Sequence, residues 1–222
     1  IPAIDGWNAF TAYVVQYAQN PAAQALFADY VRDMVTRTNR YTGQPYTDDT
    51  TIMSWQIGNE PRAFSIENKE PFRAWMSAIA ALIKSLDPNH LVSTGSEGKA
   101  GCAGDLALAE VLPNDPNVDY MTIHIWPLNW GWVAPDCLAG ARLAQAIVNT
   151  RPYIDGHLEL ARRTGKPVGL EECGFPRDGF VFTPGSPTTG RDRYYEAVFS
   201  YIHENRANGG PFAGSNFWSW GG

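Results

Sequence analysis

The sequence predicts an α/β fold built on a parallel β-sheet. Three observations support this: helical and strand-like patterns alternate along the 222 residues, the strand-like segments are short and apolar, and no repeat or low-complexity linker interrupts them. Strands that alternate with helices pair in parallel, because each helix returns the chain to the same end of the sheet. We count five helix–strand units and assign residues 1–222 to a single domain.

The first half of the chain contains two of the predicted strands. Asn20 and Pro21 predict a helix start, because Asn caps helix N-termini and Pro fits the first helical position. Pro71 predicts another start, followed by an apolar face that continues to Leu86. The predicted elements are a helix over 20–38, a strand over 52–58, a helix over 71–86, a strand over 91–95 and a short helix over 105–112.

The second half contains the other three predicted strands. They cover residues 118–127, 166–174 and 211–222, with helices over 138–163 and 191–208 between them. Pro152 is expected to kink or divide the longer helix, because it lacks a backbone N–H. Gly209 and Gly210 are expected to end the last helix.

Two architectures fit this pattern, an open doubly wound sheet and part of a closed barrel. A doubly wound sheet normally carries a glycine-rich phosphate loop after an early strand, and neither GxGxxG nor GxxxxGK[ST] occurs here. Polar residues follow several strands: Asn59 and Glu60, His124 with Trp126, Glu171 and Glu172, and Trp218 with Trp220. In a parallel barrel these strand ends form one mouth, where active sites are built.

The composition excludes several classes of partner. The formal net charge of −6 disfavours nucleic acid and anionic membranes, and no apolar run is long enough to span a bilayer. Eight tryptophans are equally consistent with core packing and with stacking on sugar rings. No signal peptide is visible, and the opening residues resemble the interior of a protein rather than a start.

The three cysteines leave two readings open. Cys102 and Cys137 lie in loop-like sequence and could form a disulfide, whereas three unpaired thiols are at least equally consistent with the odd number. No CxxC pair occurs, which disfavours a zinc ribbon.

Glutamates at two strand ends form a candidate catalytic pair. Glycosidic cleavage needs one carboxylic acid to protonate the leaving oxygen and a second carboxylate to attack or to activate water. Glu60 by itself is equally compatible with a solvated loop carboxylate, and the Glu171–Glu172 pair with a salt bridge. Successive strand side chains point to opposite faces, so only one of Glu171 and Glu172 faces the barrel interior.

Aromatic residues near these strand ends are candidate sugar contacts. His124 and Trp126 are two residues apart and share a strand face, where His124 could bond a carboxylate or a sugar hydroxyl. Trp218 and Trp220 also share a face, and core filling is a credible alternative for one of them. Trp130 and Trp132 lie in loop sequence, where exposure would indicate ligand contact.

The segments WQIGNEPR, HIWPLNWGW, LEECGF and NFWSWGG resemble signatures of glycoside hydrolase family 5. The closest resemblance is to its endo-β-1,4-mannanase branch, in family order and spacing from about Ile52 to Gly222. It implies a (β/α)8 TIM barrel of which this chain represents strands four to eight. It also implies retaining hydrolysis of β-1,4-mannan by double displacement, with no cofactor and no metal.

The resemblance also implies a role for each of several residues. It implies that Glu60 is the acid/base and that Glu172, rather than Glu171, is the nucleophile. If so, their carboxyl groups should lie about 5–5.5 Å apart. The implied substrate-binding residues are Asn59, at the sugar 2-hydroxyl, with Arg62, His124, Trp126 and Trp218; Trp130 and Trp132 join them from the loop argument.

The sequence departs from the family pattern in three ways. Trp126 stands where many members have Tyr, and an indole N–H can only donate a hydrogen bond. Cys173 stands where an aromatic residue is usual. The family's first three strands and its final helix have no counterpart here, so we expect the missing barrel strands from another chain or from omitted sequence.

Alternative functions remain at this point. An exo-β-mannosidase or a β-1,4-glucanase would use the same scaffold, and a carbohydrate-binding barrel that has lost catalysis would need neither carboxylate. A serine hydrolase lacks GxSxG, and a metallohydrolase lacks HExxH. A polysaccharide substrate predicts a secreted or periplasmic protein.

Overall fold

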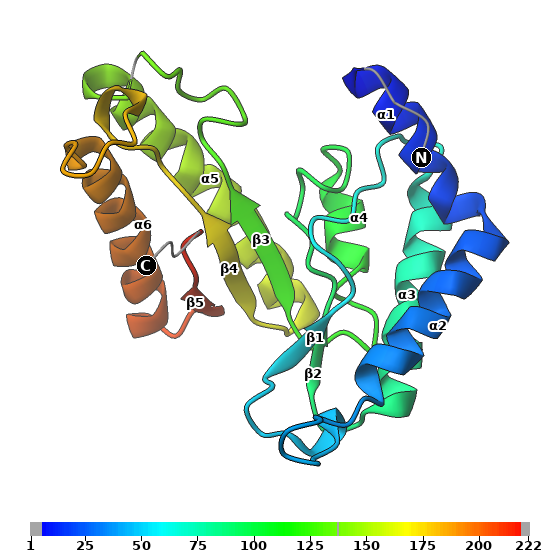
Figure 1. Cartoon of the computed structure of the whole chain (residues 1–222). Helices are drawn as coiled ribbons and strands as arrows, with labels where there is room; N and C mark the ends of the chain where they lie inside the picture. Colours follow the sequence, from blue (N-terminus) through cyan, green and yellow to red (C-terminus); the bar gives the residue numbers. More distant parts are fainter. Residues whose placement is uncertain (1–5, 137, 219–222) are drawn as a thin grey trace. The chain divides into compact units, whose positions relative to one another are not determined.

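The computed structural model describes residues 6–136 and 138–218. The chain divides into two compact units, Ile1–Met121 and Thr122–Gly222 (Figure 1). The single-domain prediction for residues 1–222 stays a prediction.

The first unit pairs two parallel strands with helices. Strand β1 aligns with β2 through Ser54↔Leu91, Trp55↔Val92 and Gln56↔Ser93. Its elements are α1 (Trp7–Val14), η1 (Val15–Gln19), α2 (Pro21–Val35), η2 (Tyr46–Asp48), β1 (Ser54–Gln56), α3 (Lys69–Leu86), β2 (Leu91–Ser93) and α4 (Leu106–Val111). The sequence did not predict α1 or η1, because neither begins with a capping side chain.

Helix starts in this unit follow the capping chemistry of the sequence. The Asn20 side chain accepts a hydrogen bond from the Ala23 N–H at 3.1 Å, and Pro21 occupies the first helical position of α2. Asp105 caps α4 in the same way, through the Ala107 N–H at 2.8 Å. Both predicted helices are confirmed.

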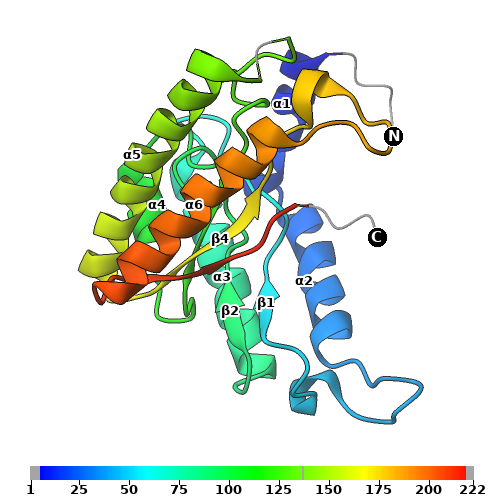
Figure 2. The same ribbon diagram turned by 90° about the vertical axis from the view of Figure 1, so that its left-hand side faces the viewer.

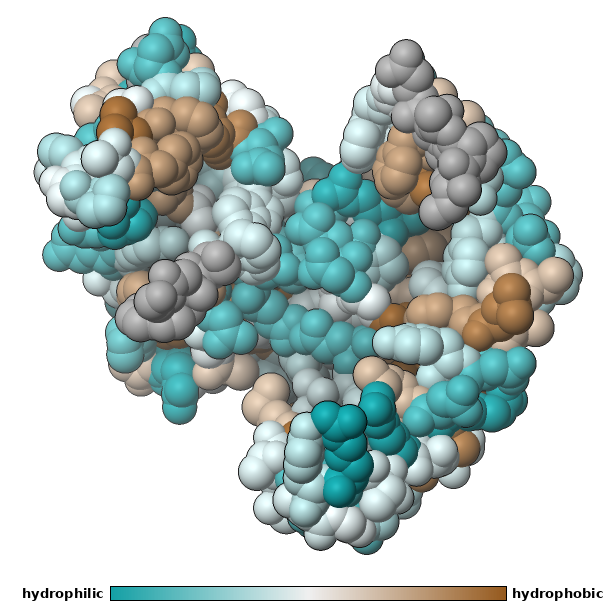
Figure 3. Space-filling model, viewed as in Figure 1, coloured by the Kyte–Doolittle hydropathy of each residue, from teal (hydrophilic) through white to brown (hydrophobic). Residues whose placement is uncertain are grey.

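The packing face of α3 is the core of the first unit. Its buried side chains recur three or four residues apart: Phe72, Met76, Ile79, Ala80 and Ile83. Helix α2 packs on α3 with Val31 and Val35 buried, whereas Leu26 and Tyr30 stay exposed. Figure 3 shows apolar surface over α2, so its apolar stripe is wider than the face that the unit covers.

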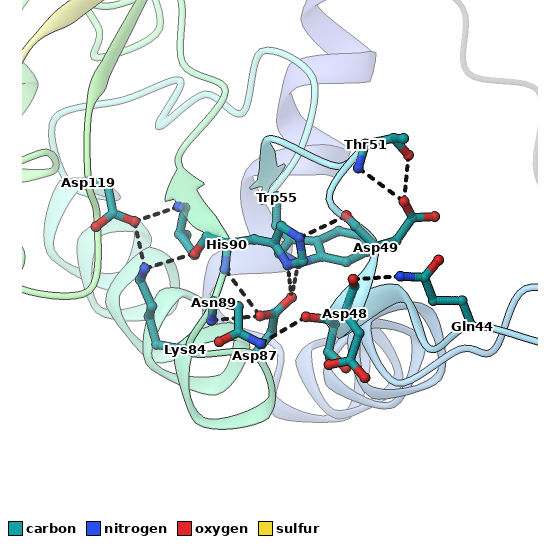
Figure 4. A network of polar contacts seen from close by, with 12 residues as sticks. Gln44, Asp48, Asp49, Thr51, Trp55, Lys84, Asp87, Asn89, His90 and Asp119 are labelled. Carbon is teal, nitrogen blue, oxygen red and sulfur yellow. Dashed lines mark hydrogen bonds and ion pairs between the residues drawn. The ribbon is translucent and has the colours of Figure 1, made fainter.

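A buried polar network lies where α3 ends and β2 begins (Figure 4). The Asp87 carboxylate is fully buried and accepts hydrogen bonds from the Trp55 Nε1–H at 2.7 Å and the Asn89 N–H at 2.9 Å. His90 Nδ1 lies 2.6 Å from the same carboxylate, and His90 Nε2 lies 3.0 Å from the Asp49 carbonyl oxygen. This network ties the 44–51 segment to β1 and β2.

The second unit is a three-stranded sheet in the order β3-β4-β5, with β4 and β5 parallel. Its elements are β3 (Met121–Ile125), α5 (Gly140–Thr164), β4 (Val168–Cys173), η3 (Asp178–Phe180), α6 (Thr189–Ala207) and β5 (Phe212–Ser215). Figure 2 shows α5 and α6 lying side by side, and they contact β4 and β5 respectively. Every residue of β3 is buried, as expected for a strand covered on both faces.

Two expectations about this unit need correction. Helix α5 runs unbroken through Pro152, so the prolyl residue does not divide it, and a kink there stays a prediction. The buried face continues on both sides of Pro152, from Thr150 to Ile154, and this packing offsets the lost hydrogen bond. Strand β5 ends at Ser215, so Trp218 lies after the strand, and Trp220 falls outside the described residues.

The described cysteines are buried free thiols. Burial raises the pKa of Cys102 and of Cys173 to about 12. Cys137, the predicted alternative partner of Cys102, lies outside the described residues. None of the helices in the described ranges is long and apolar enough to cross a membrane.

Candidate active site

Glu60 follows β1 on a strained turn. Its φ of 49° places a non-glycine residue in the left-handed region, which costs about 1 kcal/mol or more. The Glu60 N–H donates to the Gly95 carbonyl oxygen at 3.0 Å, beyond the end of the neighbouring strand β2. Strain of this kind clusters at functional sites, because only a surrounding structure can maintain it.

Arg62 is held between two carboxylates. Its Nη2–H donates to Glu60 Oε2 at 3.0 Å, and its Nε–H donates to Glu97 Oε2 at 2.5 Å. Asn59, next to Glu60, is exposed. The structure therefore brings Glu60 and Arg62 into direct contact, with Asn59 beside them on the surface of the first unit.

Glu97 is the residue that the sequence analysis missed. Its side chain is 1% exposed, which is rare for a carboxylate and requires compensation by a partner. The signal was present, because Glu97 follows β2 in the same way that Glu60 follows β1 and Glu172 ends β4. Unlike the other strand ends, the segment after β2 carries no aromatic residue and no paired carboxylate to draw attention to it.

In the second unit, Glu172 lies near the end of β4 with two ring donors beside it. The Trp126 Nε1–H donates to Glu172 Oε2 at 3.3 Å, and His124 Nδ1 lies 3.5 Å from the same oxygen. The Glu172 side chain is 15% exposed, and His124 is buried. His124 and Trp126 lie on the face of β3 that meets this carboxylate, as their two-residue spacing predicted.

The absence of a side chain at Gly174 leaves the space that the Trp126 ring occupies. A Cβ at residue 174 would lie 2.4 Å from the Trp126 ring, so any larger residue would displace the indole. Trp218 packs edge-on against Trp126 with ring centroids 5.8 Å apart. The backbone N–H of Trp218 donates to the Cys173 carbonyl oxygen at 2.9 Å. Trp218 is exposed, which leaves ring surface available for a ligand.

The loop tryptophans do not have the exposure expected of them. Trp130 and Trp132 are half-buried and pack on each other at 5.2 Å. Trp130 also packs on Tyr153 of α5 at 5.1 Å, and Tyr153 packs on His157. A helix outside the loop supplies this aromatic partner, and contact with substrate stays a prediction for both loop tryptophans.

The predicted residues thus form two groups. Glu60, Asn59 and Arg62 lie in the first unit, whereas Glu172, His124, Trp126 and Trp218 gather in the second. The predicted separation of about 5–5.5 Å between the two glutamates stays a prediction, because each belongs to a different unit.

Known proteins resemble this chain over nearly its whole length. Mannan endo-1,4-beta-mannosidase 3 of Arabidopsis thaliana is 33% identical over 214 residues, covering 90% of this chain and 49% of that protein. The solved structure of a glutamate-to-alanine mutant of a glycoside hydrolase family 5 mannosidase from Rhizomucor miehei, in complex with mannosyl-fructose, is 30% identical with a TM-score of 0.87. The match covers 100% of this chain and 53% of the mannosidase chain.

A third match is more distant. The hyperthermostable endo-1,4-beta-D-mannanase of Thermotoga petrophila RKU-1 is 26% identical with a TM-score of 0.71, covering 92% of this chain and 56% of that chain. This chain therefore spans about half the length of the proteins that it matches. The predicted fold class is confirmed, since the neighbours are (β/α)8 barrels and the described parallel strands form part of such a barrel.

A family model described as "GH family 5 beta-mannosidase-like" matches residues 3–222. With an endo-mannosidase relative at 33% identity and a mannosidase neighbour at a TM-score of 0.87, this chain belongs to the β-mannosidase-like proteins of glycoside hydrolase family 5.

Proposed function

We propose that this protein is a retaining glycoside hydrolase that cleaves β-1,4-linked mannan by double displacement. The observation that carries the proposal is the group around Glu172, where Trp126 and His124 present ring nitrogens to one carboxylate oxygen. These contacts hold the Glu172 carboxylate in one orientation, which attack on a single carbon atom requires. The family match and the mannosidase relatives support the substrate class.

The two glutamates divide the chemistry. Glu172 attacks the anomeric carbon and forms a glycosyl–enzyme bond, while Glu60 gives its proton to the leaving oxygen. Water then enters, Glu60 removes its proton, and the bond to Glu172 breaks, so that the product keeps its anomeric configuration. Trp126 orients the Glu172 carboxylate, and Trp218 offers an exposed ring to a sugar face.

The roles are separable by the leaving group. Glu172→Ala should abolish turnover of mannan and of activated aryl β-mannosides alike. Glu60→Ala should abolish mannan cleavage yet spare the first step on an aryl mannoside whose leaving group needs no proton. Glu171→Ala is the matched control and should retain activity; if Glu171→Ala instead removed turnover and Glu172→Ala did not, the nucleophile assignment would be wrong.

A second candidate is a β-mannosidase acting on chain ends. The mannosidase structure fits with a TM-score of 0.87 and the endo-mannanase of Thermotoga petrophila with 0.71, which favours this reading. The curated relative, by contrast, is an endo-1,4-beta-mannosidase. Digestion of end-labelled mannohexaose separates the two, because an exo enzyme releases mannose stepwise and an endo enzyme releases internal fragments first.

Mannan rather than glucan specificity must depend on the axial 2-hydroxyl of mannose. We propose Asn59 and Arg62 for this contact, because both lie beside Glu60, with Trp130 and Trp132 supporting neighbouring sugars. Initial rates on mannan, glucomannan and cellulose test the assignment. Faster turnover of cellulose than of mannan would replace it with a β-1,4-glucanase.

We further propose that hydrolysis requires a complete barrel. The described residues contain five strands, whereas a barrel of this type closes with eight. The remaining strands would come from another polypeptide or from additional sequence, and the 222 residues alone should then show little activity. We also propose that the protein is secreted or periplasmic, because a polysaccharide substrate lies outside the cytosol; cell fractionation followed by a mannanase assay tests this.

A further inference from the structure

One guanidinium in the first unit serves two carboxylates. Arg62 donates from Nη2 to Glu60 and from Nε to Glu97 at 3.0 and 2.5 Å, and the three side chains are 29%, 21% and 1% exposed in that order. Arg carries five N–H donors, so these two bonds leave further donors for a sugar. Glu97 touches Arg62 on the side away from solvent, and Glu60 touches it at the surface.

The backbone fixes this arrangement. Loop 95–101 bonds to the loop of Glu60 twice, through the Glu60 N–H to Gly95 O at 3.0 Å and the Ala63 N–H to Gly101 O at 3.1 Å. Gly95 has a φ of +68°, and a Cβ there would lie 1.9 Å from the Gly58 carbonyl oxygen. Only glycine permits this approach, so the loops after β1 and β2 keep Glu60 and Glu97 in fixed positions relative to each other.

The charges of this group set a requirement for catalysis. A guanidinium beside Glu60 favours the ionised carboxylate, whereas the general acid of a glycosidase must hold its proton near working pH. Glu97 offsets this effect, because its buried negative charge is paired with the same guanidinium. The nearby Lys69 and Asp105 neutralise each other in an ion pair of 2.5 Å.

We propose that Glu97 is a positioning residue, which aims Arg62 at Glu60 and balances the Arg62 charge so that Glu60 can act as the acid. This inference rests on the proposed function, in which Glu60 is the acid/base. It adds that the loop after β2 determines the pH at which Glu60 loses its proton.

The test is the titration of Glu60, followed by ¹³C NMR of the side-chain carboxyl carbon in the intact protein. Glu97→Gln keeps the shape and an oxygen for Arg62 but removes the charge. The Glu60 midpoint should then fall by about one pH unit, the lower end of the effect of an uncompensated arginine. The alkaline limb of kcat/KM on mannan should fall by the same amount, while the first step on an activated aryl mannoside keeps its rate.

Three variants make the result specific. Glu97→Asp keeps the charge and should hold the midpoint within about 0.3 unit, which also tests the inference if Glu97→Gln does not fold. Arg62→Gln should move the midpoint upward, opposite to Glu97→Gln. Glu70→Gln, at an exposed glutamate paired with Arg73, is the matched control and should change neither measurement.

The two hypotheses fail in different ways. An unchanged Glu60 midpoint in Glu97→Gln, with or without a lower melting temperature, would overturn the inference, since a purely structural role would move stability alone. A Glu97→Asp midpoint as low as that expected for Glu97→Gln would overturn it too. Absence of glycosidase activity in a wild-type barrel of full natural length would overturn the proposed function, whatever the NMR titration shows.

Discussion

Replacing Asp87 with alanine should destabilise the first unit by several kcal/mol at neutral pH. The Asp87 carboxylate is fully buried and accepts from Trp55 Nε1, His90 Nδ1 and the N–H groups of Asn89 and His90, at 2.7, 2.6, 2.9 and 3.2 Å. His90 is buried as well, and its Nδ1 and Nε2 lie 2.6 and 3.0 Å from Asp87 Oδ2 and the Asp49 carbonyl oxygen. Asp87→Ala removes a buried acceptor and leaves several donors unpaired.

The size of the effect follows from these contacts. Each buried donor left unpaired costs about 1–3 kcal/mol unless water reaches it, and Asp87 accepts from several such donors. We expect a loss of about 4 kcal/mol in the free energy of unfolding, or roughly 10 °C in Tm. Asp29→Ala is the matched control, because Asp29 is exposed in an i,i+3 pair with Arg32 and should change stability by less than about 0.5 kcal/mol.

The pH dependence gives a second check. Burial alone favours the neutral acid, but the hydrogen bonds from Trp55, His90 and Asn89 outweigh it and lower the pKa of Asp87 below its usual 3.8. Stabilisation from a group with a lowered folded pKa is present above its unfolded pKa and is lost as pH falls through the folded value. Urea unfolding of wild type and Asp87→Ala from pH 7 down to 3 should show the stability gap constant to about pH 4.5 and shrinking below it. A gap under 1 kcal/mol at pH 7, or one that widens in acid, would refute an ionised Asp87.

Three further outcomes follow from the structure. Gly174→Ala should lower the free energy of unfolding by about 1–3 kcal/mol and should lower kcat, because the new Cβ displaces Trp126 from Glu172. Gly214→Ala is the control and should change neither quantity, because the space around Gly214 is open. Thermal unfolding and steady-state kinetics measure both effects. Cys102 and Cys173, with pKa values of about 12, should resist a thiol reagent at pH 8 in the native protein and react once urea is added; rapid native labelling would contradict their burial. Hydrolysis of an aryl β-mannoside by a barrel of full natural length should first release β-mannose by ¹H NMR, and initial α-mannose would contradict retention.

Much of the fold could be predicted because its signals are local. Asn20 and Asp105 cap α2 and α4 as their side chains allow, and each predicted strand contains one of β1 to β5. Strand lengths could not be predicted, since pairing with a neighbour determines where a strand ends. The continuity of α5 through Pro152 could not be predicted for a related reason: the burial of Thr150 and Ile154 on either side of it depends on tertiary packing.

The candidate site was predictable where it follows a strand and carries an aromatic or paired acidic residue. Strand periodicity predicts that His124 and Trp126 share a face, and the structure adds that this face meets Glu172. Glu97 was not predictable in this way, because a single glutamate in a glycine-containing loop most often faces solvent. Its burial depends on the close approach of Gly95 to Gly58, which is a tertiary contact.

The surroundings of the two proposed catalytic glutamates differ in the way their roles require. Glu172 lies near the end of a regular strand, where the Trp126 Nε1–H donates to its Oε2 and His124 Nδ1 lies 3.5 Å from the same oxygen, so its carboxylate is held in one orientation. Glu60 stands on a strained turn beside a guanidinium that a second, buried carboxylate shares. Because Glu97 offsets the charge of Arg62, Glu60 experiences less stabilisation of its anion than Arg62 alone would give. Two glutamates with the same intrinsic acidity thus have different neighbours, which is the condition for one of them to donate a proton while the other attacks.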